Sequence, residues 1–263
     1  MSRSEFVVRL KLAAFFCSVP LLSLQGEEAA PLRLLTYNIH AGIGMDKQFD
    51  LERIADVILS VDPDVVALQE VDVKTTRSEG VDIAARLSEL TVMKSVFGAS
   101  IEFGGGQYGN AILTKLPLEG AEVIRIPQAV ANEERSILSV DLLFHGKSMR
   151  VLSTHFCHRE ERNRELAAEA VLASQQESDF PIILMGDLNA LPDSSPILRL
   201  NEGGWKMTSK EPLLTVPVTT PTRQIDYILF RSPVGVPIDV TGARVLEEEV
   251  ASDHRAVFVE LRW

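Results

Sequence analysis

The chain has 263 residues, a formal net charge of −11 and an apolar fraction of 46%. That length suits one large domain or two small ones, and the apolar content is enough for a full core, which excludes a disordered chain. The acidic charge argues against a broad basic face for gripping nucleic acid, because such binding is driven largely by neutralising phosphates. It is compatible with a bound metal ion, which would supply positive charge locally.

Residues 1–26 have the pattern of a secretory signal peptide. Arg3, Arg9 and Lys11 precede "LAAFFCSVPLLSL", a run of 13 uncharged and mostly apolar residues. The run is short for a transmembrane helix, and no clear lipobox precedes Cys17. We therefore expect an exported protein, periplasmic or extracellular, with an uncleaved membrane anchor as the alternative. Removing residues 1–26, which hold three basic side chains and one acidic side chain, would leave a net charge of −13.

The remaining chain, residues 30–263, is expected to form one α/β domain. Its only cysteine is Cys157, which excludes an internal disulfide and predicts a buried, inert thiol. Apolar periodicity predicts helices over 50–61, with Asp50 as the N-cap, over 81–90 and over 159–176. Strands are predicted over 32–38, 64–71, 108–115 and 181–185, as a hairpin over 137–155, and as three runs after residue 222. No linker or repeat divides this region, so we expect a single mixed sheet.

Two motif-like segments are not expected to carry chemistry. "GGGQYG", residues 104–109, matches a dinucleotide fingerprint, but a strand follows it where a helix is required, so it predicts a flexible loop. "HFCH", residues 155–158, lacks the partner pair that a structural zinc site needs. The chain also has no G-x-S-x-G, so a serine hydrolase is unsupported.

Polar side chains stand at the tips of six predicted strands. Apolar runs end in Asn38, Glu70, His155 and the pair Asp187 and Asn189, whereas two later runs begin with Asp226 and with Asp253 and His254. If the last two strands run antiparallel to the first four, all these groups meet at one rim.

Such a rim would gather four carboxylates, which repel one another unless a cation or proton intervenes. A hard divalent cation with oxygen ligands satisfies this demand, and the histidines supply groups that titrate near neutral pH. Each residue also has a structural alternative. Asp187 and Asn189 could cap a turn, and Asp226 could pair with Arg223.

Seven motifs in order resemble the endonuclease/exonuclease/phosphatase superfamily. They are "TYNIH", "LQE", "YGNAIL", "STH", "GDLN", "IDYI" and "SDH", and they span residues 36–254. The superfamily includes pancreatic-type deoxyribonucleases, abasic-site endonucleases, neutral sphingomyelinases and inositol polyphosphate 5-phosphatases. The resemblance implies a four-layer α/β sandwich, in which two packed mixed sheets are flanked by helices.

The resemblance also implies roles for the rim residues, residue by residue. It makes Glu70 the main ligand of Mg²⁺ (or Mn²⁺), with Asn38 and Asp253 close to the metal. Asp187 would orient or activate the attacking water. Three residues would act on the phosphate: Asn189 would hold a non-bridging oxygen, His155 would donate to it, and His254, held by Asp226, would be the base or a stabilising group. Asn110 and Arg135 would line the site.

The motifs favour some substrates over others. "LMGDLNAL" and "ASDHRAV" fit the inositol 5-phosphatases poorly. The N-terminal motifs resemble small bacterial members of uncertain substrate and a domain of proteins linked to glycosylphosphatidylinositol remodelling. We therefore expect a metal-dependent phosphodiester hydrolase acting on a lipid head group or small diester, without a protein partner. A secreted nuclease is the first alternative, and a catalytically silent binding module is the second.

Overall fold

The computed structural model describes residues 30–174 and 178–263. The predicted signal peptide and the end of the helix predicted over 159–176 lie outside these described residues. Among the helices of the described part of the chain, none is long and apolar enough to cross a membrane.

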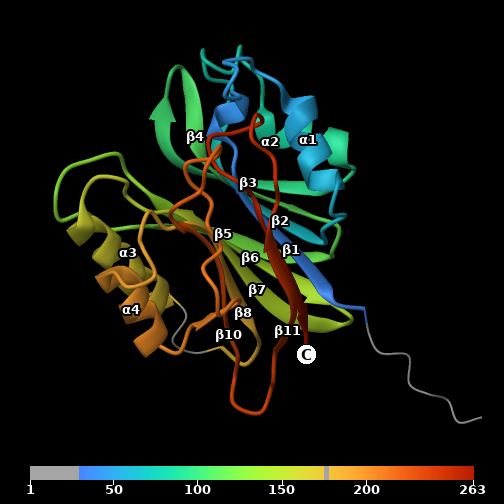
Figure 1. Cartoon of the computed structure of the whole chain (residues 1–263), viewed down its shortest axis with the longest axis vertical. Helices are drawn as coiled ribbons and strands as arrows, with labels where there is room; N and C mark the ends of the chain where they lie inside the picture. The colour runs from blue at the N-terminus through green and yellow to red at the C-terminus, as the bar shows by residue number, and fades with distance from the viewer. Residues whose placement is uncertain (1–29, 175–177) are drawn as a thin grey trace, which may run out of the picture.

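Two six-stranded mixed sheets form the centre of the molecule (Figure 1). The first has the order β11-β12-β1-β2-β4-β3. Its strands, in chain order, are β1 (Leu32–Asn38), β2 (Val65–Val73), β3 (Lys94–Phe103), β4 (Gly106–Thr114), β11 (Asp239–Val245) and β12 (Val257–Arg262). The second has the order β5-β6-β7-β8-β10-β9. Its strands are β5 (Leu118–Arg125), β6 (Ser136–Phe144), β7 (Lys147–His155), β8 (Ile182–Asp187), β9 (Lys206–Met207) and β10 (Asp226–Arg231).

Within residues 30–174 and 178–263, four α-helices cover the outer faces of the two sheets. α1 (Leu51–Leu59) and α2 (Ile83–Thr91) lie against the first sheet, whereas α3 (Glu161–Ser174) and α4 (Ser195–Glu202) lie against the second (Figure 1). A short 3₁₀ helix, η1 (His40–Gly42), follows β1. The implied four-layer α/β sandwich is therefore confirmed, and the single mixed sheet expected from the strand pattern is wrong. Periodicity identifies strands but does not say which of them share a sheet.

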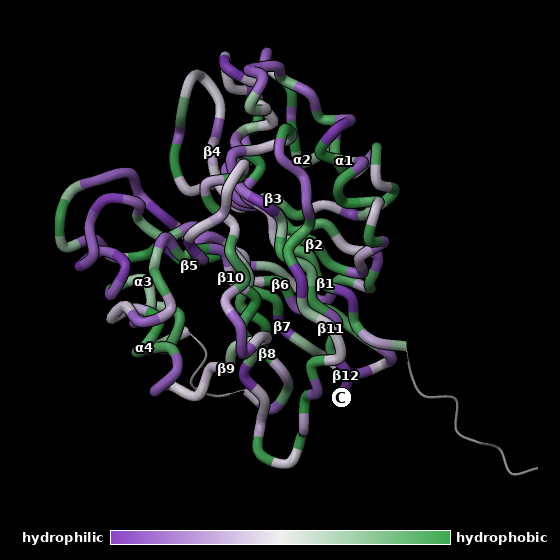
Figure 2. Tube along the Cα trace, in the orientation of Figure 1, coloured by the Kyte–Doolittle hydropathy of each residue, from purple (hydrophilic) through white to green (hydrophobic). Residues whose placement is uncertain are grey.

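Three apolar cores separate the four layers, and alternation along the strands fills them. In β1, Leu32 and Leu34 face the core between the sheets, whereas Leu35 and Tyr37 face α1 and α2. The same period of two divides the side chains of β8 between the inter-sheet core and the core beneath α3 and α4. Because both faces are covered, apolar residues predominate in these strands, and hydrophobic residues concentrate along them (Figure 2).

Local signals in the sequence act as expected at several element ends. Asp50 caps α1 by accepting from the Arg53 N–H at 2.9 Å, and Asp82 caps α2 in the same way. Cys157 is buried and free.

The sequence pattern missed β3, β5, β9 and α4. The expected flexible loop at 104–109 is also wrong, because Gly104 and Gly105 form a tight turn between β3 and β4.

The topology brings the predicted strand tips to one rim. β1 and β2 are a parallel pair in the first sheet, and β7 and β8 are a parallel pair in the second. β12 and β10 run antiparallel to them, as expected. The predicted rim is therefore formed by strand ends from both sheets. The inter-sheet core beneath the rim fixes the separation of the two sheets.

Gly186 provides a stability test of this rim. A Cβ at Gly186 would lie 2.0 Å from the Thr154 carbonyl oxygen of β7, and its φ is +151°. We expect Gly186→Ala to destabilise the fold by about 2 kcal/mol or more, because the clash is with backbone in a packed strand pair. Urea denaturation measures the change. Gly120→Ala is the matched control, since nothing lies within 4 Å of its Cβ position in β5. Equal unfolding midpoints for the two variants would contradict this packing.

Candidate active site

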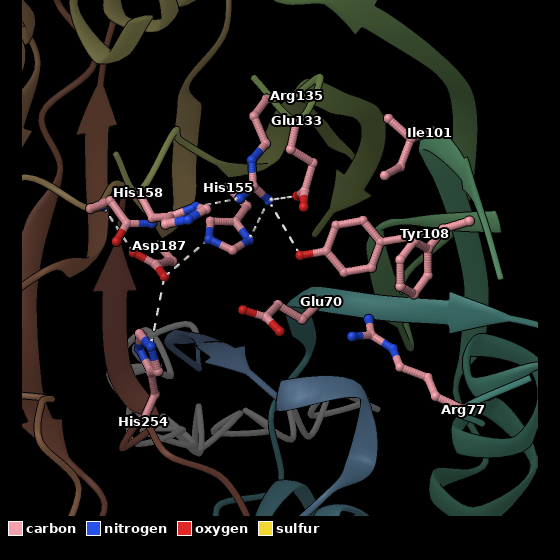
Figure 3. A pocket seen from close by; sticks show the side chains of 12 residues that line it. Glu70, Arg77, Ile101, Tyr108, Glu133, Arg135, His155, His158, Asp187 and His254 are labelled. Atoms are coloured by element: carbon pink, nitrogen blue, oxygen red, sulfur yellow. Dashed lines mark hydrogen bonds and ion pairs between the residues drawn. The ribbon is translucent and has the colours of Figure 1, made fainter. Parts of the chain in front are cut away.

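A cavity of about 290 Å³ opens at the shared rim of the two sheets (Figure 3). We call it the main cavity. Both sheets and the loops that follow their strands supply its walls: Glu70, Arg77, Ile101, Phe103, Tyr108, Glu133, Arg135, His155, His158, Asp187, Asn189 and His254. Most of the side chains in this lining are titratable, which is unusual for a cavity that lies at the ends of largely apolar strands.

Asp187 and Asp226 lie directly opposite each other in the antiparallel pair of β8 and β10. Both are buried, and like charges so placed destabilise a sheet. Burial, and after it the charge of Asp226, raises the pKa of Asp187 to about 7. This carboxyl group can therefore gain and release a proton near neutral pH.

Polar groups from three other segments converge on the Asp187 carboxylate. Its Oδ2 accepts from Asn38 Nδ2 at 3.1 Å and lies 3.3 Å from His155 Nε2 and 3.8 Å from His254 Nε2. The backbone N–H of Asn189 donates to Oδ1 at 2.9 Å, with Asn189 in the left-handed region at a φ of 46°. The carboxylate is thus held in one orientation.

His254 is paired with Asp226 and retains its proton. Its Nδ1 lies 2.9 Å from Asp226 Oδ2, which also accepts from Thr215 Oγ1. Burial by itself lowers the pKa of His254, but the charge and hydrogen bond of Asp226, helped by Asp187 and Asp253, raise it to about 10. His254 is therefore a charged donor that turns Nε2 toward Asp187.

His155 has the opposite character. Arg135 Nη1 donates to its Nδ1 at 2.9 Å, and because a guanidinium only donates, Nδ1 must be the unprotonated nitrogen. Nε2 then carries the hydrogen and faces Asp187. Burial, followed by the charge of Arg135, holds the pKa of His155 well below its usual range. The site therefore contains one neutral and one protonated histidine on either side of the same carboxylate.

Glu70 is aimed into the main cavity by an irregularity in β2. The pairing of β2 with β4 shifts between Leu68 and Val71, and Glu70 between them has a φ of 58°. The left-handed region costs a residue other than glycine about 1–2 kcal/mol, and bulges of this kind often re-aim side chains next to active sites. The sequence pattern placed Glu70 at the end of its strand. In the structure Glu70 lies inside β2. Its Oε1 accepts from Asn38 Nδ2 at 3.2 Å.

The donors at this rim fit a hard divalent cation. Ligand atoms of Asp187, Asp226 and His254 all lie within 4.8 Å of one another, and Asp226 Oδ1 is buried without a hydrogen-bond partner among the described residues. His254 Nδ1 and Asp226 are already engaged with each other, whereas Glu70 projects its carboxylate into the cavity and, among the described residues, accepts a hydrogen bond from Asn38 alone. Anionic oxygens of this type are the ligands that Mg²⁺ uses.

The other predicted site residues differ in their hydrogen bonds and in whether they line the main cavity. Asn38 turns its NH₂ toward Glu70 and Asp187, and its oxygen accepts from the His40 N–H. Asp253 does not line the main cavity but a neighbouring hollow that His254 also lines.

Asn110 is buried in β4 outside the lining of the main cavity and donates to the Ser136 carbonyl at 3.1 Å. Arg135 does line the cavity, forming an ion pair with Glu133 at 2.9 Å. Asn189 lines it as well, while its Nδ2 donates to the Phe156 carbonyl.

The sequence pattern missed one wall of the main cavity. Arg77 donates from Nε and Nη2 to the buried Asp72 at 2.6 and 2.8 Å. Its guanidinium carbon lies 4.8 Å from the centre of the Phe103 ring and 5.4 Å from that of Tyr108. Its guanidinium group points toward Glu70 (Figure 3). Tyr108 could have been found as the residue that opens "YGNAIL", but no local signal marks Arg77.

His158 was also missed as a member of the site, because "HFCH" was weighed only as a zinc motif. It lines the mouth of the main cavity, where Arg135 Nη2 approaches its Nδ1 at 3.4 Å. Burial and the neighbouring Arg135 lower the pKa of His158.

Comparisons with known proteins agree with this geometry. The sequence model of the Endonuclease/Exonuclease/phosphatase family matches residues 35–254. The uncharacterized protein YbhP of Escherichia coli is 25% identical over 226 residues, covering 78% of this chain and 89% of that protein.

Among solved structures, an endonuclease/exonuclease/phosphatase from Beutenbergia cavernae is 26% identical with a TM-score of 0.73, covering 89% of this chain and 72% of that one. The mannosyl-6-phosphatase Bt3783 of Bacteroides thetaiotaomicron shares the fold at 16% identity and a TM-score of 0.73, covering 88% of this chain and 100% of that one.

The chain belongs to the endonuclease/exonuclease/phosphatase family. Nucleases and phosphatases both hydrolyse phosphoester bonds, so the reaction class of the family is phosphoester hydrolysis. The motif resemblance seen in the sequence is thereby confirmed.

The pairing of His254 with Asp226 predicts a titration that can be observed directly. In metal-free protein, His254 should remain protonated well above pH 8, and Asp226→Asn should lower its pKa by about 2 units, because one close opposite charge is lost. Since the folded-state pKa lies above the ordinary 6.5, the pair stabilises the fold fully below pH 6.5, and this contribution is lost as pH rises through about 10. NMR titration of the histidine ring protons in the wild type and in the variant measures both states. An unchanged His254 titration in Asp226→Asn would contradict the pairing.

Proposed function

We propose that this protein is an exported, metal-dependent phosphodiesterase that hydrolyses a lipid head-group ester or another small phosphodiester. The convergence of Asn38, His155 and His254 on Asp187 Oδ2, beside the carboxylate of Glu70 that Asn38 also contacts, carries this proposal. Hydrolysis of a phosphate ester needs an oriented water, donors for the phosphoryl oxygens and charge stabilisation at the leaving oxygen.

Asp187 is suited to activate the water. A general base works best when its pKa lies near the operating pH, and the pKa of Asp187 is about 7. Asn38 and the Asn189 N–H fix the orientation of the carboxylate. A water bound at Asp187 would therefore meet a base that is both positioned and able to take a proton.

The histidines are suited to hold the phosphoryl group. His254 offers a charged Nε2–H, with Asp226 fixing its ring, and a protonated imidazole is a donor and not a base. His155 offers a neutral Nε2–H, fixed by Arg135. These two donors would stabilise negative charge on the non-bridging oxygens as it grows.

The metal ion would be held by Glu70, with Asn38 next to it, and it would neutralise charge on the phosphoryl and leaving oxygens when bound. Mg²⁺ is proposed, with Mn²⁺ as a substitute, because the available groups are hard oxygen donors.

Charge and size favour a small substrate. Without residues 1–26 the chain carries a net charge of −13, so a long polyanion is repelled away from the site. The main cavity, at about 290 Å³, is close to the size that holds a small organic ligand. A secreted nuclease is the second candidate, because the family includes nucleases. The intact set of titratable groups disfavours a silent binding module.

Glu70→Gln tests the metal assignment. We expect kcat/KM with Mg²⁺ to fall by on the order of 10²-fold or more, because a metal ion supplies several kcal/mol of transition-state stabilisation. The variant should unfold at the wild-type temperature, since it keeps the size and the hydrogen bond of the side chain. Glu202→Gln, on the exposed end of α4, is the matched control. Wild-type turnover of Glu70→Gln at limiting Mg²⁺ would remove Glu70 from the metal site.

A substrate panel tests the substrate class. Purified protein lacking residues 1–26, with Mg²⁺ or Mn²⁺, is assayed on bis-p-nitrophenyl phosphate, sphingomyelin, inositol phosphates, RNA and supercoiled plasmid. We expect activity on a small or lipid diester to exceed activity on DNA. Salt between about 50 and 200 mM should change it only a few-fold, because one or two phosphates are contacted. Nicking of plasmid without hydrolysis of any small or lipid diester would favour the nuclease instead.

A further inference from the structure

A second hollow adjoins the main cavity at His254 and Asn189. We call it the side hollow. Its volume is about 330 Å³, and Asn189 and His254 line both spaces. These two residues therefore form a shared wall, and a phosphoryl group held there has room on each side.

The side hollow is built largely by the loop of residues 215–225, which enters β10. The Thr215 N–H donates to the Arg223 carbonyl, and the Thr222 N–H donates to the Val216 carbonyl, closing the loop on itself. Arg255 Nε holds the Val218 carbonyl at 2.7 Å. Thr215 also donates to Asp226, so the base of the loop is tied to the partner of His254.

The lining of the side hollow differs from that of the main cavity. Val216, Val218, Ile225 and Met45 give it an apolar body. Its charged side chains are Arg223, Asp253 and the shared His254. Away from the shared His254, the charges of Arg223 and Asp253 are of opposite sign, so this part of the hollow suits a substituent with a carbon body.

From this arrangement we propose that the side hollow binds one of the two ester substituents of a phosphodiester, while the other substituent lies in the main cavity. This deepens the proposed function and rests on it. The two ester substituents of a diester extend from the phosphorus in different directions, and the structure has one space on each side of the shared wall. A phosphate monoester has one substituent and leaves one space unused, so the arrangement favours diesters.

Thr219 provides a way to fill the side hollow without touching the shared wall. It is exposed and lines the hollow, whereas the neighbouring Thr220 is exposed and does not. Thr219→Trp adds a large side chain in the hollow, and Thr220→Trp is the matched control for the same change in the same loop.

We expect Thr219→Trp to lower kcat/KM for bis-p-nitrophenyl phosphate by about 10-fold or more, because a displaced substituent misplaces the reacting phosphorus. For Thr220→Trp the same kcat/KM should stay within about 2-fold of wild type, because Thr220 does not line the side hollow and the substituent is not displaced. Inhibition by inorganic phosphate, which has no ester substituent, should be unchanged in both variants. Unchanged inhibition separates a filled subsite from damage to Asn189 or His254.

Three results overturn the inference while leaving phosphoester hydrolysis in place. One is an unaffected diester activity in Thr219→Trp, and another is an equal loss in Thr220→Trp. The third is a wild-type kcat/KM for p-nitrophenyl phosphate above that for bis-p-nitrophenyl phosphate. Wild-type protein without activity on any phosphate ester would instead overturn the proposed function itself, and the inference with it.

Discussion

The site depends on two carboxylates that the sheet register places face to face. Asp187 and Asp226 are opposite each other at the start of the β8–β10 pairing, and both are almost fully buried. An apolar sheet accepts two such groups only if their charges are compensated. His254 compensates Asp226, and Asn38 and His155 turn their donors toward Asp187. Burial, and after it the repulsion from Asp226, raises the pKa of Asp187 to about 7.

Backbone strain at the rim serves the same arrangement. Glu70 and Asn189 both have positive φ, at 58° and 46°, and both line the main cavity. Such conformations persist where surrounding structure holds them: Glu70 lies at the irregularity within the β2–β4 pair, and Asn189 closely follows the end of the β8–β10 pair. Gly186 allows β8 to approach the Thr154 carbonyl so closely that any Cβ would clash. The rigid double sheet thus stabilises a few strained residues at its edge.

Charge is distributed unevenly between the surface and the site. The chain as a whole is strongly acidic, yet Arg77, Arg135 and three histidines line the main cavity. The carboxylates Glu70, Glu133 and Asp187 line the same cavity, so its cationic groups lie next to anionic ones, while the net charge of the chain opposes the approach of a long polyanion. The side hollow adjoins the main cavity, and about half of its lining residues are apolar.

The sequence by itself determined the helix cap at Asp50, the buried strands and most of the residues at the rim, because these depend on local periodicity and short motifs. It did not determine the division of the strands between two sheets, since a strand buried on both faces has the same pattern in either. It also missed Arg77 and His158, which reach the main cavity only through contacts between distant segments.

Whether a polar strand tip acts as a ligand, a base or a donor was decided by the tertiary structure alone. Asn38 turns its NH₂ to two carboxylates, Asp253 faces the side hollow, and His155 and His254 differ in protonation. The physical reason is that a pKa and a hydrogen-bond direction depend on which charges and donors lie within a few ångströms. Those neighbours come from strands that are far apart in the chain.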